Sequence, residues 1–142
     1  MITLVIFDSN FGNTKIIAEI IAKVLDAKAV PVSNFNSNEI EGIDLLIVGS
    51  PIIAWKPSEK MIKFLESLTN GQLRGIKATT FDTRVKLFIH GDAAKKIANH
   101  LERAGAKIIV EPQGFFVKGR EGPLFEDEIE KATKWAETIK SK

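Results

Sequence analysis

The chain alternates short, almost wholly apolar runs with longer stretches in which apolar residues recur at helical spacing. The runs at 2–7 and 44–49 contain hardly a polar side chain, and β-branched residues are frequent in them. Continuous apolarity over five or six residues is typical of a strand that is buried on both faces. A strand of this kind needs helices on both sides of its sheet. The alternation therefore predicts an α/β fold, a doubly wound parallel sheet between two helical layers.

Five strands and four helices are expected. The strands are predicted at 2–7, 27–32, 44–49, 76–82 and 106–110, and the last resumes at 115–117. The helices are predicted at 14–25, 58–68, 92–104 and 125–140. Ser58 and Asp92 are the expected N-caps of the second and third helices, and Gly105 is the expected stop of the third. Trp135 is expected in the core. With no linker or internal repeat, one domain over residues 1–142 is predicted.

Composition excludes several classes of function. The 20 basic and 18 acidic side chains leave a formal net charge of +2, which is too balanced to indicate a nucleic-acid surface. Without cysteine there is no disulfide, thiolate nucleophile or zinc–thiolate site. The two histidines, His90 and His100, are far apart and do not indicate a metal site. No apolar stretch approaches a membrane span, and no basic leader precedes the first apolar run, so a cytoplasmic protein is expected.

The loop FDSNFGNT, residues 7–14, is the most informative part of the chain. It leads from the first strand into the first helix, where unpaired N–H groups and the helix dipole favour an anion. Gly12 allows the backbone to approach a ligand closely, and Ser9, Asn10, Asn13 and Thr14 add polar side chains. Since the loop carries no cation, a phosphate bound here is expected without an ion pair. The alternative is a plain turn with Asn13 as the N-cap, and the two interpretations are compatible.

Other phosphate-binding folds fit less well. A Walker loop requires GxxxxGK[ST], and a dinucleotide fingerprint requires GxGxxG, whereas this loop contains only Gly12. A phospho-receiver domain requires clustered acids after the first strand and another at the end of the third. Asp8 is alone after the first strand, and the third strand ends in Gly49-Ser50.

The pattern that remains resembles the flavodoxin family. Its phosphate loop runs T-x-[ST]-G-x-T, and Ser9, Gly12 and Thr14 match it, with Asn13 as the commonest family residue. Phe11 departs from the usual hydroxyl and is similar to the aromatic residue in flavodoxin domains of flavo-diiron proteins. The segments DLLIVGSPIIAWKPSEKMIKFL and GDAAKKIANHLERAGAKII extend the resemblance along the chain. Flavodoxins are the standard example of strand order 2-1-3-4-5, with FMN at the point where that order reverses, and this fold is implied here.

The resemblance also implies the cofactor-binding residues. They lie in three loops: Ser9, Asn10, Phe11, Gly12, Asn13 and Thr14; Ser50, Pro51, Ile52, Ile53, Ala54 and Trp55; and Phe81, Asp82, Thr83 and Arg84. The chain has no tyrosine, so the family's stacking tyrosine is missing, and Phe88 is one candidate to replace it.

Several of these residues allow two interpretations. Phe11 either packs over the helix as a hydrophobic cover or lines the cofactor pocket. Trp55 either stacks on the flavin or anchors its loop on Ile52 or Ile53. Arg84 either pairs with Asp82 or lies near the flavin ring and stabilises its reduced form. Lys56 is expected to be solvated, and KGREGP at 118–123 is expected to be the turn into the last helix.

The expected function is electron transfer by a protein that binds FMN, with a redox protein as a possible partner. No side chain is indicated as a nucleophile, an acid–base catalyst or a metal ligand. Classical flavodoxins are acidic, whereas this chain is slightly basic, which disfavours the usual partners. The alternatives are a flavin-free binding or regulatory module, an FMN-dependent NAD(P)H or quinone oxidoreductase, and a protein that binds another nucleotide.

Overall fold

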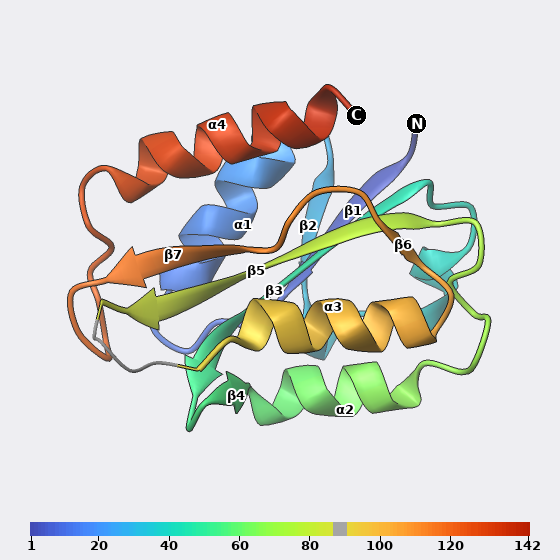
Figure 1. Cartoon of the computed structure of the whole chain (residues 1–142), viewed down its shortest axis with the longest axis horizontal. Helices are drawn as coiled ribbons and strands as arrows, with labels where there is room; N and C mark the ends of the chain where they lie inside the picture. Colours follow the sequence, from blue (N-terminus) through green and yellow to red (C-terminus); the bar gives the residue numbers. More distant parts are fainter. Residues whose placement is uncertain (87–90) are drawn as a thin grey trace.

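The computed structural model describes residues 1–86 and 91–142 (Figure 1). Its strands are β1 (Thr3–Phe7), β2 (Lys28–Pro31), β3 (Leu45–Ile53), β4 (Lys56–Pro57), β5 (Lys77–Val85), β6 (Lys107–Ile108) and β7 (Gln113–Val117). Its α-helices are α1 (Asn13–Val24), α2 (Glu59–Ser67), α3 (Ala93–Arg103) and α4 (Glu128–Lys140). Two short 3-10 helices, η1 (Val32–Asn34) and η2 (Ser37–Ile40), lie between β2 and β3.

The main sheet is parallel, with strand order β2-β1-β3-β5-β6. β7 continues beside β5 where β6 has ended, so the fifth predicted strand is indeed interrupted and resumed. The chain moves outward from β1 to β2 and then crosses to β3 on the other side of β1. The strand order therefore reverses between β1 and β3, and the predicted doubly wound α/β fold with order 2-1-3-4-5 is confirmed.

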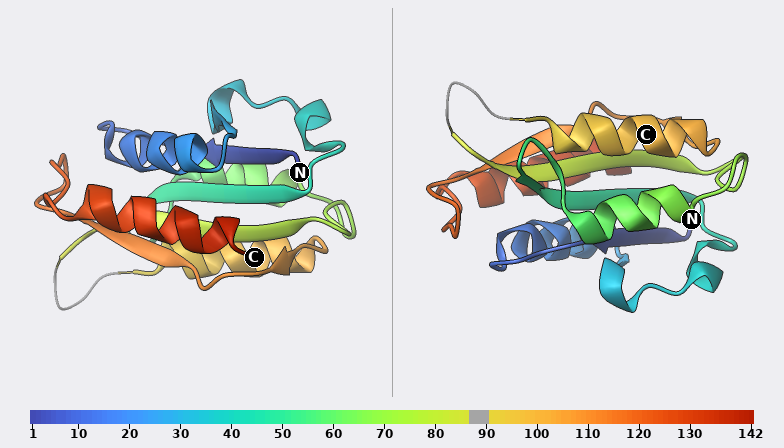
Figure 2. Two further views of the ribbon diagram at one scale, coloured as in Figure 1. Left: turned by 90° about the horizontal axis from the view of Figure 1, so that it is seen from above. Right: turned by 90° about the horizontal axis from the view of Figure 1, so that it is seen from below.

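Two helices cover each face of this sheet (Figure 2). α1 and α4 pack together on one face, and α2 and α3 pack together on the other. Side chains alternate between the faces along β1, because successive residues of a strand point in opposite directions. Leu4 and Ile6 join the apolar cluster under α2 and α3, whereas Val5 and Phe7 join the one under α1 and α4. The unbroken apolar run in the sequence is the consequence of these two cores.

Trp135 of α4 lies in the second core, as the sequence predicts. It is 7% exposed, and its ring makes edge contacts with Phe81 at 6.2 Å and Phe115 at 5.9 Å between ring centroids. Gly49 of β3 faces the same aromatic group, since a Cβ atom at this position would overlap the ring of Phe81. The absence of a side chain at Gly49 therefore leaves room for the end of the Phe81 ring beside the neighbouring strand.

The predicted helix ends are largely confirmed. The side chains of Ser58 and Asp92 accept hydrogen bonds from the backbone N–H groups of Met61 and Lys95. Gly105 follows the last turn of α3 with a φ of +110°, a conformation that glycine adopts readily. The alternative with Asn13 as N-cap of α1 is wrong: Gly12 is the N-cap, with a φ of +92°, and Asn13 is the first helical residue.

Two predicted loops are partly strand. Residues 50–57 form a β-hairpin, because β3 continues to Ile53 and turns back into β4. Ala54 and Trp55 form the tip with φ angles of +49° and +73°, a turn that suits the twist of a two-residue hairpin. β5 continues to Val85 instead of ending at 82, so Thr83 and Arg84 lie on a strand. Their positions are therefore set by the ladder with β3 and β7.

Among residues 1–86 and 91–142, none of the helices has the length and apolar character that crossing a lipid bilayer requires. The same residues contain no group of three or more histidine, aspartate or glutamate side chains placed to hold a metal ion.

Candidate functional site

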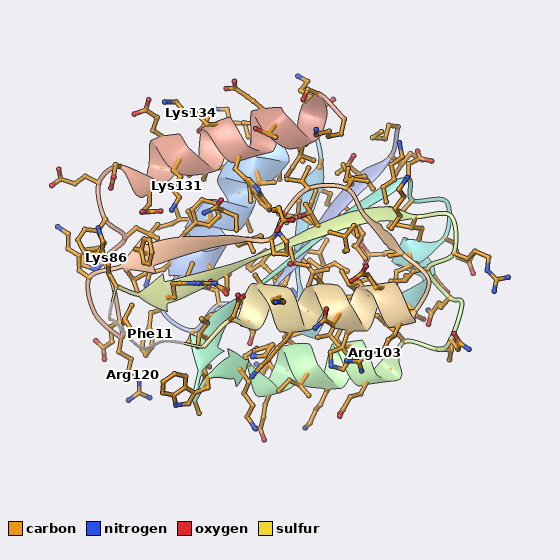
Figure 3. All side chains as sticks on the ribbon, in the orientation of Figure 1. Phe11, Lys86, Arg103, Arg120, Lys131 and Lys134 are labelled. Carbon is orange, nitrogen blue, oxygen red and sulfur yellow. The ribbon has the colours of Figure 1, made fainter. Side chains whose placement is uncertain are left out.

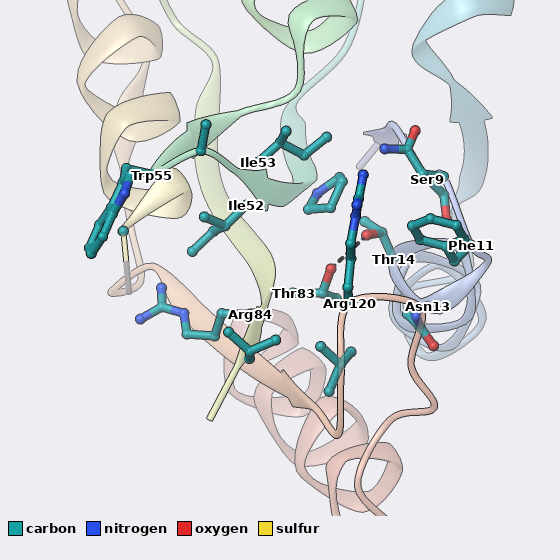
Figure 4. A pocket seen from close by; sticks show the side chains of 16 residues that line it. Ser9, Phe11, Asn13, Thr14, Ile52, Ile53, Trp55, Thr83, Arg84 and Arg120 are labelled. Carbon is teal, nitrogen blue, oxygen red and sulfur yellow. Dashed lines mark hydrogen bonds between the residues drawn. The ribbon is translucent and has the colours of Figure 1, made fainter. Parts of the chain in front are cut away.

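A cavity of about 560 Å³ opens at the carboxyl ends of β1, β3 and β5 (Figure 4). This is the edge where the strand order reverses, and open parallel sheets bind their ligands there. Cavities of this size are typical of small-molecule sites. Twelve of the sixteen candidate residues line it: Ser9, Asn10, Phe11, Asn13, Thr14, Pro51, Ile52, Ile53, Ala54, Trp55, Thr83 and Arg84.

One end of the cavity is the loop between β1 and α1. Ser9 Oγ accepts hydrogen bonds from the backbone N–H groups of Gly12 at 3.1 Å and Lys15 at 3.2 Å, which folds the loop around the serine. Within the described part of the chain, the backbone N–H groups of four loop residues have no hydrogen-bond partner. These residues are Asn10, Phe11, Asn13 and Thr14. Unpaired amides at a helix N-terminus form a site for an anion.

The first turn of α1 is tied to the end of β5. The hydroxyl groups of Thr14 and Thr83 lie 2.8 Å apart in a buried hydrogen bond that joins residues far apart in sequence. Both hydroxyls border the cavity, and each can also serve a ligand atom because a hydroxyl both donates and accepts. The bond therefore holds the loop 9–14 and the end of β5 together at the cavity.

The hairpin β3–β4 forms the apolar wall. Ile52 and Ile53 line the cavity, and Trp55 projects at the hairpin tip with 54% of its surface exposed. Lys96 of α3 donates a hydrogen bond of 2.9 Å to the carbonyl oxygen of Trp55, which holds the tip against the start of α3. Phe11, which is 49% exposed, lies on the opposite loop and also lines the cavity. A flat aromatic ligand therefore finds aromatic side chains at both sides of the opening.

The predicted pairing of Arg84 with Asp82 is confirmed, and the placement of Arg84 near a flavin ring stays a prediction. Arg84 lines the cavity and also forms a two-point ion pair with Asp82, with hydrogen bonds of 2.7 and 2.6 Å. Burial raises the pKa of Asp82 above its ordinary value, although the hydrogen bonds and charge of Arg84 oppose it. Burial lowers the pKa of Arg84, but the hydrogen bonds and charges of Asp82 and Asp92 outweigh that effect and raise it. Arg84 thus stays protonated, and its charge is compensated within the protein.

Four candidates do not line the cavity. Ser50 is fully buried, donates to the carbonyl of Pro51 at 2.9 Å and accepts from the backbone N–H of Ser58 at 3.0 Å. Phe81 points into the aromatic core, and Asp82 is buried below Arg84. Gly12 is the N-cap of α1, and its positive φ sets the turn of the loop. Phe81 and Asp82 come before the residues of β5 that reach the cavity, Thr83 and Arg84.

Four lining residues escape the sequence analysis: Val85, Gly91, Val117 and Arg120. Arg120 adds to the cavity wall a cation that the sequence analysis did not expect there. The stretch 118–123 was expected only as a turn, yet it follows β7, whose carboxyl end lies at the same sheet edge as that of β5. The available signal was therefore a glycine-rich, basic stretch after a strand. Phe88 and His90 lie outside the described residues, and Lys56 is exposed.

Comparisons with known proteins agree with the observed fold. A family model for a flavodoxin domain matches residues 4–138. Oxidised flavodoxin 2 from Bacillus cereus is similar with a TM-score of 0.85 and 23% identity, and 99% of each chain is covered. Oxidised flavodoxin 1 from the same organism has a TM-score of 0.85 and 18% identity, with 99% of this chain and 98% of that chain covered.

A third similar structure belongs to a larger protein. Rubredoxin oxygen:oxidoreductase from Desulfovibrio gigas has a TM-score of 0.79 and 19% identity, and the match covers 96% of this chain and 34% of that chain. No curated protein sequence matches this chain. At these identities the similar structures show a shared fold and nothing more. The family model shows the family, because it matches almost the whole chain.

Proposed function

Since the chain belongs to the flavodoxin-domain family, which matches residues 4–138, we propose that it binds FMN without a covalent bond and transfers electrons. The observation that carries the proposal is the cavity at the reversal of the strand order. One end of this cavity offers unpaired backbone amides, and the other end is apolar and aromatic. FMN has the same division, with a phosphate at one end and a flat ring system at the other.

The loop 9–14 fits the phosphate. The unpaired N–H groups of Asn10, Phe11, Asn13 and Thr14 supply donors, and the N-terminus of α1 supplies a partial positive charge. The space beside Gly12 is open, since a Cβ atom there would meet no atom within 4 Å. The residues present therefore suit a phosphate monoester that is held by backbone groups and hydroxyls.

The apolar wall fits the ring. Ile52, Ile53 and Trp55 would hold the flat ring, with Phe11 on the opposite side of the opening. When bound, FMN supplies the redox chemistry, because its ring accepts and releases electrons. An apolar wall disfavours extra negative charge on that ring and so lowers its reduction potential. The compensated charge of Arg84 opposes this effect only weakly.

Electron transfer suits the cavity better than acid–base catalysis. Among the described residues that line it, Arg84 and Arg120 are the only ionisable side chains, and a guanidinium has no acceptor atom with which to take up a proton. Phe11, Ile53 and Trp55 leave the opening largely apolar and exposed, which allows a redox protein to approach closely. A redox protein is accordingly the proposed partner. The cytoplasmic location and the single domain over residues 1–142 stay predictions.

The first experiment is a visible absorption spectrum of the purified full chain, recorded before and after incubation with FMN and desalting. We expect the bands of a bound flavin, shifted from those of free FMN. The loaded protein is then reduced without oxygen and mixed with ferricyanide, and its bands are expected to return. A colourless chain that retains no added FMN would contradict the proposal and favour the flavin-free module.

A further inference from the structure

Arg120 reaches the cavity from a part of the chain that is remote from the anion-binding loop. It lies in the loop between β7 and α4 (Figure 3) and lines the cavity together with Ser9, Asn13 and Thr14. In Figure 4 its side chain extends across the opening, between Ile53 on one side and Phe11 on the other. Among the described residues, Arg120 has no carboxylate within ion-pair distance. Its charge is therefore available to a ligand.

The loop that carries Arg120 is held in place by its backbone. Lys118 N donates to the carbonyl of Pro123 at 2.8 Å, and Gly122 N donates to the carbonyl of Gly119 at 2.9 Å. These two bonds close residues 118–123 into a compact turn.

The same turn is docked on the anion-binding loop. Asn13 Nδ2 donates a hydrogen bond of 3.1 Å to the carbonyl oxygen of Glu121, directly beside Arg120. Gly122 lies against the same side chain, so closely that a Cβ atom would come within 2.6 Å of Asn13 Nδ2. Asn13 thus connects the start of α1 to the turn that presents Arg120. The backbone of Arg120 is therefore held close to the amides of the loop 9–14.

The other nearby cations are less suited to a bound anion. Lys15 is exposed on α1 and does not line the cavity. Arg84 lines the cavity, but its guanidinium already donates two hydrogen bonds to the carboxylate of Asp82. Within residues 1–86 and 91–142, Arg120 is therefore the one lining cation whose charge is uncompensated.

We infer that Arg120 forms an ion pair with the phosphate of the bound flavin and thereby makes the site select FMN over riboflavin. The inference rests on the proposed function. A guanidinium forms strong, directional hydrogen bonds with phosphate oxygens, and a phosphate monoester carries close to two negative charges near neutral pH. Riboflavin has the same ring without the phosphate, so Arg120 contributes nothing to its binding.

The test uses the full chain, freed of flavin beforehand. Quenching of flavin fluorescence measures the dissociation constants of FMN and riboflavin at low and at high salt. Arg120→Gln is expected to weaken FMN binding by about tenfold and to leave riboflavin binding unchanged. It is also expected to reduce the salt dependence of FMN binding, because one ion pair is lost. Lys118→Gln is the matched control: it removes the same charge from the same loop, but Lys118 does not line the cavity.

The possible results separate failure of the inference from failure of the proposed function. Equal weakening of FMN and riboflavin in Arg120→Gln would overturn the inference, because Arg120 would then contact the ring. Unchanged FMN binding in this variant would overturn it as well, while the proposed function would stand. A wild-type chain that binds neither flavin would contradict the proposed function and the inference with it. Arg120→Lys, which keeps the charge but not the two-point geometry, is expected to recover part of the FMN affinity.

Discussion

Arg84 and Asp82 lie two residues apart on one face of β5, and Arg84 Nε and Nη2 donate hydrogen bonds of 2.7 and 2.6 Å to the Asp82 carboxylate. Asp82 is fully buried and also accepts a hydrogen bond of 2.9 Å from the backbone N–H of Ala94, at the start of α3. The pair therefore joins the end of β5 to the helix that packs on it, and it neutralises a cation of the cavity wall.

Arg84→Met is expected to lower the free energy of unfolding by about 3 kcal/mol, because it leaves the buried carboxylate of Asp82 without a counter-charge. Urea unfolding of the flavin-free chain measures the effect. The double variant Asp82→Asn/Arg84→Met should regain much of the loss, since the buried charge is then gone. Equal stability of the single and double variants would show that the pair is not what stabilises this part of the fold.

Gly12→Asp is expected to weaken FMN binding by about a hundredfold, because it places a negative charge in the loop proposed to hold the phosphate. Flavin fluorescence quenching measures the dissociation constant. Gly42→Asp is a matched control: Gly12 and Gly42 have φ angles of +92° and +80°, and a Cβ atom at either would meet nothing within 4 Å. Similar FMN affinities of the two variants would contradict a phosphate site at the loop.

Trp55→Leu is expected to weaken the binding of FMN and riboflavin by the same factor, about five- to tenfold, because the lost contact is with the shared ring. The same fluorescence titrations measure both constants. Ile129→Ala serves as control, since Ile129 is 49% exposed but lies on α4 and does not line the cavity. A loss confined to FMN would place Trp55 near the phosphate instead.

His100 on α3 is expected to make stability depend on pH. Partial burial, followed by the charge of Arg103, lowers the pKa of His100 below its ordinary value of 6.5, and Glu66 opposes this shift. At a pH between the pKa of His100 in the folded chain and its ordinary value in the unfolded chain, the unfolded chain binds more protons. The contribution of neutral His100 to the free energy of unfolding is therefore fully present above about pH 6.5 and decreases as the pH falls below it. Urea unfolding of His100→Gln is expected to show a smaller decrease towards acidic pH than that of the wild type. Identical pH profiles of the two proteins would disprove this contribution.

Much of the fold is predictable because its signals are local. The apolar run at 2–7 and the helical spacing at 14–25 indicate the elements that became β1 and α1. Ser58 and Asp92 cap helices as expected, because an N-cap acts on a backbone group only three residues away. The loop 9–14 is recognisable for the same reason, since its glycine and polar residues adjoin a helix start. Whether these residues bind FMN stays a prediction.

Side-chain direction at the strand ends was less predictable. Ser50 and Phe81 were candidates for the site, yet they are buried, whereas Thr83 and Arg84 line the cavity. β5 extends three residues beyond its expected end, because β3 and β7 supply partners on both sides. The length of a strand thus depends on its neighbours, and a residue lines the opening when it lies close enough to the carboxyl end of its strand.

The type and order of the helices and strands could be predicted from the sequence alone, since each element depends on residues within a few positions of one another, and the loop after β1 was recognisable for the same reason. Three features became visible only in the folded chain: Arg120 lines the same cavity, Thr83 meets Thr14, and Asp82 compensates Arg84. The first two contacts join residues far apart in the chain. They form because burial of the two apolar cores holds β1, β5 and β7 in register, and no local pattern carries that information.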